Sequence, residues 1–183
     1  MTPPESFLVR PARRDDVSAI EELIERSVRE LSSPWYDPAQ IESALRYIFG
    51  VDTQLVDDGT YYVVVQDTAL TAAGGWSKRR TLFGGDQWKH EADELLDPAQ
   101  EPARIRAFFV HPDWSRRGLG RLLFETALHD ARSAEFRRME LMATLPGEPL
   151  YRALGFTPEE RIELELPDGV RIPLIRMSRQ IER

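Results

Sequence analysis

Apolar residues recur with two different spacings along the chain, and the first spacing predicts helices near the N-terminus. Within residues 17–31, and again within residues 38–50, they return every three or four positions, which is the period of an amphipathic helix. Asp15 or Asp16 can cap the first of these helices. A short apolar stretch at residues 7–10 comes before both and predicts a first strand.

The second spacing consists of alternating or continuous apolar residues, which predict strands. Residues 61–66 and 69–78 flank a short turn and predict an antiparallel hairpin. Within it, Gly74 and Gly75 mark a bulge or a close approach of another backbone. We also expect strands at residues 105–110 and 139–143, a hairpin at residues 161–177 around a Pro-Asp-Gly turn, and helices at residues 118–135 and 149–154.

Residues 81–103 show poor periodicity, and we expect at most a short helical piece near residues 91–96. An ordered insertion of this length is often functional rather than a mere connection. The segment is acidic, and two interpretations stay open. Its charge attracts a cationic amine, or it is an ordinary solvated surface.

The length and composition of the chain exclude several classes of protein. A chain of 183 residues fits a single domain, here residues 1–183, with a substantial core. It has no cysteine, which excludes disulfides, thiolate metal sites and a cysteine nucleophile, and no metal-binding motif appears. The net charge of −7 argues against general nucleic-acid binding. No apolar run is long enough for a membrane helix and no signal core is present, so we expect a cytoplasmic protein.

A basic glycine loop, Ser-Arg-Arg-Gly-Leu-Gly-Arg at residues 115–121, lies between the predicted strand at 105–110 and the helix that follows it. The free amides of a helix start, together with the helix dipole, favour an anion at such a place. A phosphate loop of the Walker type needs a lysine and a hydroxyl residue after the glycines, and a dinucleotide fingerprint needs a third glycine where Leu123 stands. Both of these motifs are therefore excluded.

The loop instead resembles the x-x-G-x-G loop of the GCN5-related N-acetyltransferase (GNAT) superfamily. A second stretch, Leu-Tyr-Arg-Ala-Leu-Gly-Phe at residues 150–156, is similar to another motif of that family. The resemblance implies a mixed α/β fold with a central sheet of about six to seven strands, about four helices, and a parallel pair of strands that splay apart in the middle. The predicted strand–helix–strand unit, as a right-handed crossover, fits such a parallel pair.

The resemblance also implies acetyl-CoA as co-substrate, without a metal. Backbone amides of the glycine loop would bind its pyrophosphate, with charge-assisted contacts from the arginines. The backbone of Phe108, Phe109 and Val110 would align the pantetheine, and an N–H near Val110 would polarise the thioester carbonyl. The loop residues assigned to the cofactor are Arg116, Arg117, Gly118, Leu119, Gly120 and Arg121.

Tyr151 matches the tyrosine of the family that protonates the departing thiolate. Two positions depart from the family pattern: Ser115 stands where arginine or glutamine usually opens the loop, and Thr144 stands where asparagine is frequent. These departures put one side-chain contact to the cofactor and one helix-start or cofactor contact in question.

The acceptor side is less clear from the sequence. Trp35 and Tyr36, between the first two helices, and Trp76 and Ser77, at the end of the hairpin, occupy positions that border the acceptor site in the family. The alternative is that the aromatic residues of these pairs only pack on the core. The general base stays open among His111, His90, Glu91 and a chain of water molecules.

These observations predict an N-acetyltransferase in which a primary amine, most simply a small molecule, attacks the thioester directly. Two alternatives remain: an acyl-CoA-binding sensor without turnover, and an interaction module that reuses the fold. Dimers are common among relatives of this family, so a homodimer stays open, although no feature of the sequence specifies an interface.

Overall fold

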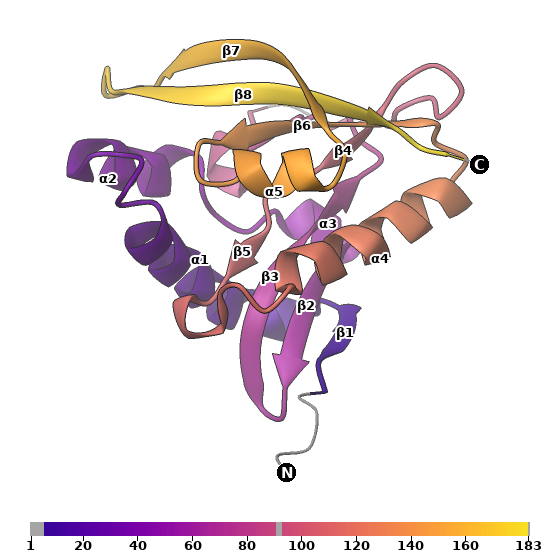
Figure 1. Ribbon diagram of the computed structural model, residues 1–183, viewed down its shortest axis with the longest axis horizontal. Helices are drawn as coiled ribbons and strands as arrows, with labels where there is room; N and C mark the ends of the chain where they lie inside the picture. Colours follow the sequence, from indigo (N-terminus) through magenta and orange to yellow (C-terminus); the bar gives the residue numbers. More distant parts are fainter. Residues whose placement is uncertain (1–5, 91–92, 183) are drawn as a thin grey trace.

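The computed structural model describes residues 6–90 and 93–182, which form a mixed α/β fold around one sheet. Its strands follow the order β1-β2-β3-β4-β6-β8-β7, and β5 pairs with β3 beside this path. In Figure 1, β6, β8 and β7 run across the top, and β1, β2, β3 and β5 run below them. The strands are β1 (Leu8–Pro11), β2 (Tyr61–Gln66), β3 (Ala69–Ser77), β4 (Ala103–Ile105), β5 (Phe109–Val110), β6 (Arg138–Thr144), β7 (Thr157–Glu165) and β8 (Arg171–Gln180).

The α-helices of the described residues are α1 (Val17–Leu31), α2 (Pro38–Tyr47), α3 (Thr53–Asp57), α4 (Leu119–Ser133) and α5 (Glu148–Ala153). Single 3₁₀ turns occur at Arg14–Asp16, Asp86–Trp88 and Pro112–Trp114. No helix among the described residues is long and apolar enough to cross a membrane.

The start of α2 shows how sequence sets a helix boundary. The Asp37 carboxylate accepts a hydrogen bond of 2.8 Å from the backbone N–H of Gln40, and the Gln40 side chain accepts one of 3.0 Å from the N–H of Asp37. This reciprocal pair is a capping box, and Pro38 fits the first turn because that turn needs no N–H donor there. The helix ends at Tyr47, earlier than the predicted Gly50.

The predicted cap of α1 is wrong. Asp16 does precede the helix, but its carboxylate does not bond to a helical N–H. It accepts instead from the backbone N–H of Arg13 at 2.7 Å and from the guanidinium of Arg10 at 2.7 and 2.8 Å. The carboxylate therefore closes the 3₁₀ turn that leads into α1 and ties it to β1.

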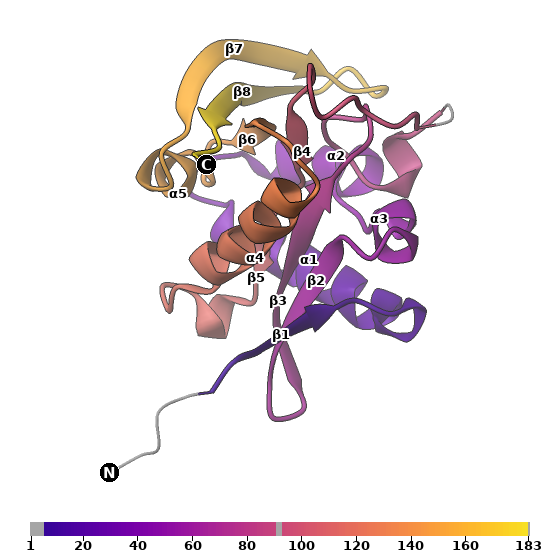
Figure 2. The same cartoon turned by 90° about the vertical axis from the view of Figure 1, so that its right-hand side faces the viewer.

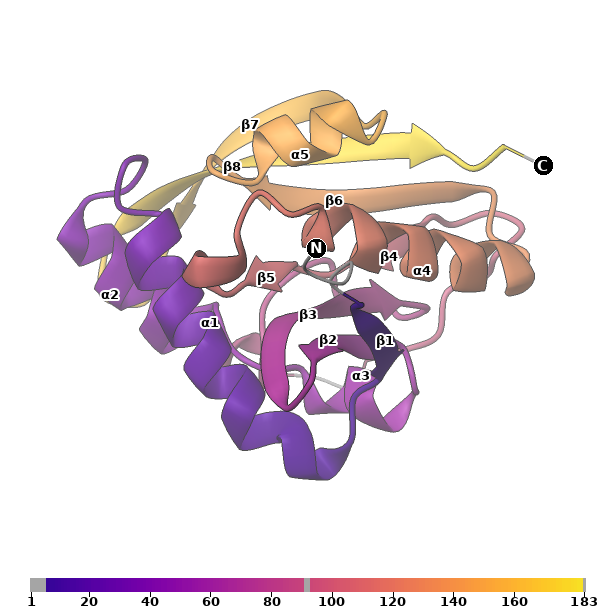
Figure 3. The ribbon, with the colours of Figure 1, turned by 60° about the horizontal axis from the view of Figure 1, so that its bottom comes forward.

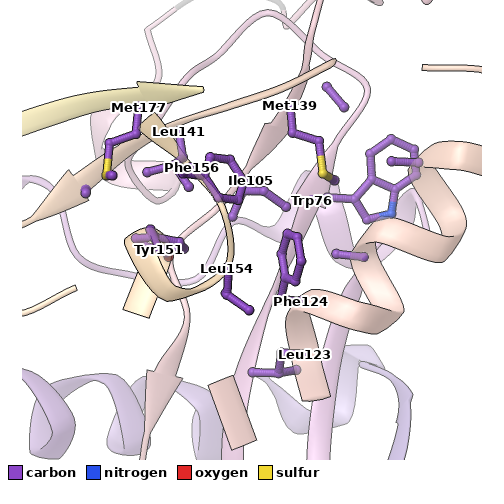
Figure 4. Packing of buried hydrophobic residues seen from close by; sticks show 14 of the residues in the cluster. Trp76, Ile105, Leu123, Phe124, Met139, Leu141, Tyr151, Leu154, Phe156 and Met177 are labelled. Atoms are coloured by element: carbon purple, nitrogen blue, oxygen red, sulfur yellow. The ribbon is translucent and has the colours of Figure 1, made fainter. Parts of the chain in front are cut away.

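Two apolar cores lie on opposite faces of the sheet, as expected from the alternation of side chains along a strand. On β2, Tyr62 and Val64 belong to the core that α4 covers, whereas Tyr61 and Val63 belong to the core that α1 covers. Figures 2 and 3 show α4 and α1 on the two sides of these strands. Figure 4 shows the first core, with Trp76 beside α4.

The predicted continuous strand at residues 105–110 is broken. β4 ends at Ile105, opposite Trp76, and β5 begins at Phe109, opposite Ala73. Three residues, 106–108, therefore face only two residues of β3, Gly74 and Gly75. One extra residue in one strand of a pair is a β-bulge, which bends the chain locally.

The two glycines on β3 are required by this bulge and by the neighbouring backbone. A Cβ on Gly74 would lie 2.7 Å from the carbonyl oxygen of Ala107 and 2.5 Å from the ring of Phe108. A Cβ on Gly75 would lie 2.1 Å from the carbonyl oxygen of Thr60. The predicted close approach is thus correct, and the extra residue belongs to the facing segment.

In the segment at residues 81–103 a helical piece was expected near residues 91–96. Of these, the described residues 93–96 are not helical, and Leu95 forms an isolated antiparallel bridge with Arg79, while residues 91 and 92 lie outside the described part of the chain. Part of its acidic charge is neutralised, since Glu94 and Glu101 both pair with Arg80. The segment also supplies the wall of a cavity described below.

Candidate functional site

A cleft opens where β5 and β6 diverge. β4 pairs with β6 in parallel, through Ala103 opposite Met139, but β5 pairs with β3 on its other side. The gap between β5 and β6 is a recess of about 180 Å³. Its walls come from α1, β6 and α5, together with residues 107–110. The cleft follows from the bulge, because the bulge is what turns β5 away from its parallel neighbour.

The peptide group of Val110 faces this cleft. The N–H of His111 donates to the carbonyl oxygen of Thr71 at 2.9 Å. In an antiparallel ladder, successive residues of a strand direct their N–H groups alternately toward the partner strand and away from it. Because His111 directs its N–H toward β3, the preceding residue, Val110, directs its N–H away from β3. Val110 lines the cleft, which places an N–H donor on its wall.

Tyr151, on α5, lines the same cleft. Its ring packs against the rings of Phe108 and Phe156, with centroid distances of 6.0 and 5.8 Å. Burial raises the pKa of the Tyr151 hydroxyl well above its ordinary value, while a hydrogen bond from the backbone of Phe108 acts in the opposite direction. The phenol is therefore protonated at neutral pH, which is the state that a proton donor needs.

The glycine loop leads from β5 into α4. Gly118 precedes the helix with a φ of 82°, a left-handed conformation that favours glycine, and a Cβ there would meet no atom within 4 Å. The first hydrogen bond of the helix runs from the N–H of Leu122 to the carbonyl of Gly118, at 3.0 Å. The N–H groups of residues 119–121 therefore have no partner within the helix and can bind an anion.

Contacts with α5 connect this loop to Tyr151. Gly120 faces Leu150, because a Cβ on Gly120 would lie 2.8 Å from a methyl group of Leu150. Leu150 in turn lines the cleft next to Tyr151. Thr144 also contributes here, since its hydroxyl accepts from the N–H of Gly147 at 3.2 Å. The threonine that replaces the frequent asparagine thus keeps a contact at the start of α5.

The three arginines of the loop are all exposed, but they differ in their surroundings. The guanidinium of Arg117 stacks on the ring of Trp114, 4.7 Å from its centroid. Arg116 adopts a left-handed backbone with a φ of 64°. Arg121 lies within the first turn of α4. Together they place positive charge around the free amides of the helix start.

A second, smaller cavity of about 50 Å³ adjoins the cleft. The two share five lining residues: Phe49, Ala107, Phe109, Met142 and Thr144. Three polar residues line only the second cavity, namely Asp52, Tyr61 and Arg106. Sequence reasoning missed all three. A signal was available for Arg106, a charged residue that interrupts the apolar run near the start of the predicted strand at residues 105–110.

The residues predicted to line the acceptor site do not line either recess. Trp76 is buried in the core beside α4, where its ring packs on Phe136 and its N–H donates to the hydroxyl of Tyr62 at 3.1 Å. Ser77 is buried, and its hydroxyl accepts from the N–H of Arg79 at 3.0 Å. Successive side chains of β3 point to opposite faces of the sheet. This alternation explains why the side chain of Trp76 points to the face opposite the cavity.

The other predicted acceptor pair, Trp35 and Tyr36, also lines neither recess. The Tyr36 hydroxyl donates to the carbonyl of Pro173 at 2.8 Å and accepts from the N–H of Leu145 at 2.9 Å, so it ties the loop after β6 to β8. Burial raises the pKa of Tyr36 to about 12. Trp35 is 51% exposed and lines neither recess. The surroundings of both residues are typical of a structural role.

Of the residues suggested as the general base, the structure describes His111 and His90. Both ring nitrogens of His111 are engaged: Nδ1 accepts from the N–H of Asp113 at 3.2 Å, and Nε2 lies 2.9 Å from a guanidinium nitrogen of Arg26. His111 and His90 line neither the cleft nor the cavity. Glu91 lies outside the described residues.

The site therefore combines a cleft at a splayed parallel pair, a free amide on its wall, and a basic loop that leads into a helix start. The chain belongs to the acetyltransferase (GNAT) family, because residues 20–156 match the model of that family. No curated protein matches the chain by sequence.

Solved structures share the fold at low sequence identity. A GCN5-related N-acetyltransferase from Rhodopseudomonas palustris aligns with a TM-score of 0.70 and 14% identity, over 94% of each chain. The PaiA N-acetyltransferase from Thermoplasma acidophilum, solved with coenzyme A, aligns with a TM-score of 0.65 and 12% identity, over 96% of this chain and 99% of that one. A phosphinothricin acetyltransferase from Sinorhizobium meliloti, solved with acetyl-CoA, gives 0.63 and 20%, over 96% and 88%.

Proposed function

We propose that this protein is an acetyl-CoA-dependent N-acetyltransferase that acts on the primary amine of a small molecule. The observation that carries the proposal is the meeting of two recesses at the β-bulge. The cleft has an N–H donor and a protonated phenol on its walls, and the adjoining cavity shares five lining residues with it. Two ligands can therefore meet at this point without a covalent intermediate on the protein.

The cleft residues fit acetyl-CoA. Free amides at residues 119–121, with positive charge around them, suit the pyrophosphate. Gly118 leaves the backbone open to a phosphate, because no side chain covers it. The outward peptide group of Val110 suits the amide-bearing pantetheine, which can pair with β5 as a strand would.

The chemistry requires a bond exchange and a proton transfer. Acetyl-CoA supplies the acetyl group, whose carbonyl carbon bonds to the amine nitrogen as the carbon–sulfur bond breaks. The N–H of Val110 stabilises the negative charge on the carbonyl oxygen, an effect of about 3 kcal/mol per donor in other enzymes. Tyr151 gives its proton to the thiolate, which leaves as the free thiol of CoA, and the proton that the amine nitrogen loses passes through solvent to the Tyr151 phenolate.

Calorimetric titration with acetyl-CoA and CoA tests the binding step. The matched variants are Gly118→Val and Gly169→Val, because both glycines have left-handed φ values, 82° and 80°, and both face open space. The backbone strain is therefore similar, but only Gly118 belongs to the loop. We expect the Gly118 variant to lose acetyl-CoA affinity by about 10-fold or more, a change of about 1.4 kcal/mol, and the Gly169 variant to keep it.

A thiol-release assay with a panel of small amines tests the transfer step. Release that depends on the amine supports the proposal. Binding of acetyl-CoA without release from any amine would favour the sensor alternative, and a folded protein that binds no CoA would favour the interaction module.

A further inference from the structure

The cavity beside the cleft contains two buried polar atoms without a hydrogen-bond partner among the described residues. They are the hydroxyl of Tyr61 and Oδ2 of Asp52. Both residues line the cavity and are 3% exposed. Buried polar atoms nearly always have a partner, so two unsatisfied atoms at one cavity mark a place where a polar group of a ligand can bind.

The other contacts of Asp52 are satisfied within the protein. Its Oδ1 accepts from the N–H of Gln54 at 3.1 Å and from the ammonium of Lys89 at 2.6 Å. Its Oδ2 lies 2.9 Å from Nη1 of Arg106, close enough for charge attraction but not aligned for a hydrogen bond. Arg106 donates instead to the carbonyl of Gly84. Oδ2 thus keeps a free acceptor position.

The charges around this polar end are balanced. Lys89 lies between Asp52 and Asp93, 3.5 Å from the second carboxylate, and Arg106 completes two cations against two carboxylates. The four side chains are at most 13% exposed. An additional ionised group would leave a net charge away from water, which is costly. The group that binds here is therefore neutral.

The position of the polar end follows from strand register. Tyr61 pairs with Gly75 on β3, and the N–H of Arg106 donates to the carbonyl of Gly75. Phe109, beside the cleft, pairs with Ala73, which is two residues away along the same strand. Along the backbone of β3, these two pairing positions are therefore about 7 Å apart.

The space between the two ends is apolar and narrow. Ile105, Phe109, Met142 and Leu174 line it, with Phe49 at the junction. A cavity of about 50 Å³ has room for roughly three or four water-sized groups. A short unbranched chain fits this space better than a bulky or branched one.

We propose that the acceptor is a small primary amine with a hydroxyl group at the far end of a short apolar chain. One hydroxyl meets both needs of the polar end, since it donates to Oδ2 of Asp52 and accepts from the hydroxyl of Tyr61. A second ammonium or a carboxylate would upset the balanced charge. This acceptor class rests on the proposed acetyl transfer.

The test compares four acceptors with the same number of carbon atoms in the thiol-release assay: 3-amino-1-propanol, propylamine, 1,3-diaminopropane and 3-aminopropanoate. We expect kcat/KM for the amino alcohol to exceed that of each other amine by about 10-fold or more, because a site built for a hydroxyl discriminates against analogues without one. Tyr61→Phe should lower kcat/KM for the amino alcohol to about that for propylamine, so that the preference for the hydroxyl is lost.

Tyr61→Phe should fold normally, because the lost hydroxyl bonds to no group of the described protein. Tyr62→Phe is the control: this neighbour faces the opposite core, and its hydroxyl bonds to Asp130, so its loss should affect stability and not the preference. Equal turnover of all four amines, or a preference that survives Tyr61→Phe, overturns the acceptor class and leaves acetyl transfer standing. Failure to bind acetyl-CoA, or to acetylate any amine, overturns both.

Discussion

The rings of Phe108 and Tyr151 lie 6.0 Å apart, and the backbone of Phe108 lowers the pKa of the Tyr151 hydroxyl, against the effect of burial. One residue of the bulge therefore contacts the ring of the proposed proton donor and also acts on its hydroxyl. The feature that opens the cleft also fixes the group that works in it.

Tyr151→Phe should lower kcat by about 100-fold, since general acid catalysis typically contributes that much or more. The KM for acetyl-CoA should change little, because the ring contacts remain. Steady-state kinetics measures both values, and a thermal melt checks that the variant folds. A variant with wild-type kcat would remove Tyr151 from the mechanism.

The pH dependence of kcat follows from the raised pKa of Tyr151. The phenol loses its proton only above its ordinary value of 10, so loss of the proton donor should not lower kcat below that pH. A pH–rate profile up to pH 10, with Tyr151→Phe beside it, checks this expectation. An alkaline decline centred near pH 8 that the variant abolishes would contradict it.

Gly74→Ala should affect both stability and turnover. Its new methyl group would lie 2.5 Å from the Phe108 ring and push on the bulge. Overpacking of this kind typically costs about 1–3 kcal/mol in the free energy of unfolding. Urea unfolding and kcat measure the two effects. Gly59→Ala, at a left-handed glycine in open space, is the control and should change stability but not kcat.

The ion pair of Asp58 and Arg79 should make stability depend on pH. The hydrogen bond from Arg79, at 2.6 Å, holds the pKa of Asp58 below its ordinary value of 3.8. A depressed pKa stabilises the fold at pH values above 3.8, and that stability is lost as the pH falls through the folded-state pKa.

Asp58→Asn should therefore lower the free energy of unfolding at pH 7 by about 1–2 kcal/mol. The gap to the wild type should narrow as the pH falls below 3.8. Asp15→Asn, at an exposed position, should change little at either pH. A gap for Asp58→Asn that stays constant down to pH 2.5 would contradict the ion-pair explanation.

Local signals made much of the fold predictable. The helices α1 and α4 and the β2–β3 hairpin follow from hydrophobic spacing, and α2 follows from its capping residues and Pro38. The glycine loop and Tyr151 could be found because their chemistry depends on short contiguous stretches.

The broken strand and the acceptor cavity could not be predicted in the same way. An apolar run from Ile105 to Val110 has the pattern of one strand, and only the register against Gly74 and Gly75 reveals the extra residue. The cavity brings together Asp52, Tyr61 and Arg106 from three separate segments, so no local pattern contains it. Trp76 was misplaced because the sequence does not state which face of β3 its side chain joins.

The peptide groups of β5 that point away from β3, into the cleft, have a consequence for solubility. Unpaired peptide groups along a strand are a template for aggregation with other chains. Here that template lies between β3 and β6, within the span of the sheet, where a slender extended ligand fits better than a foreign strand with its side chains. The outer edge strand β7 is protected by other means, with five charged residues and a proline among its nine residues. The molecule thus keeps the edge that attracts a ligand apart from the edge that must repel other proteins.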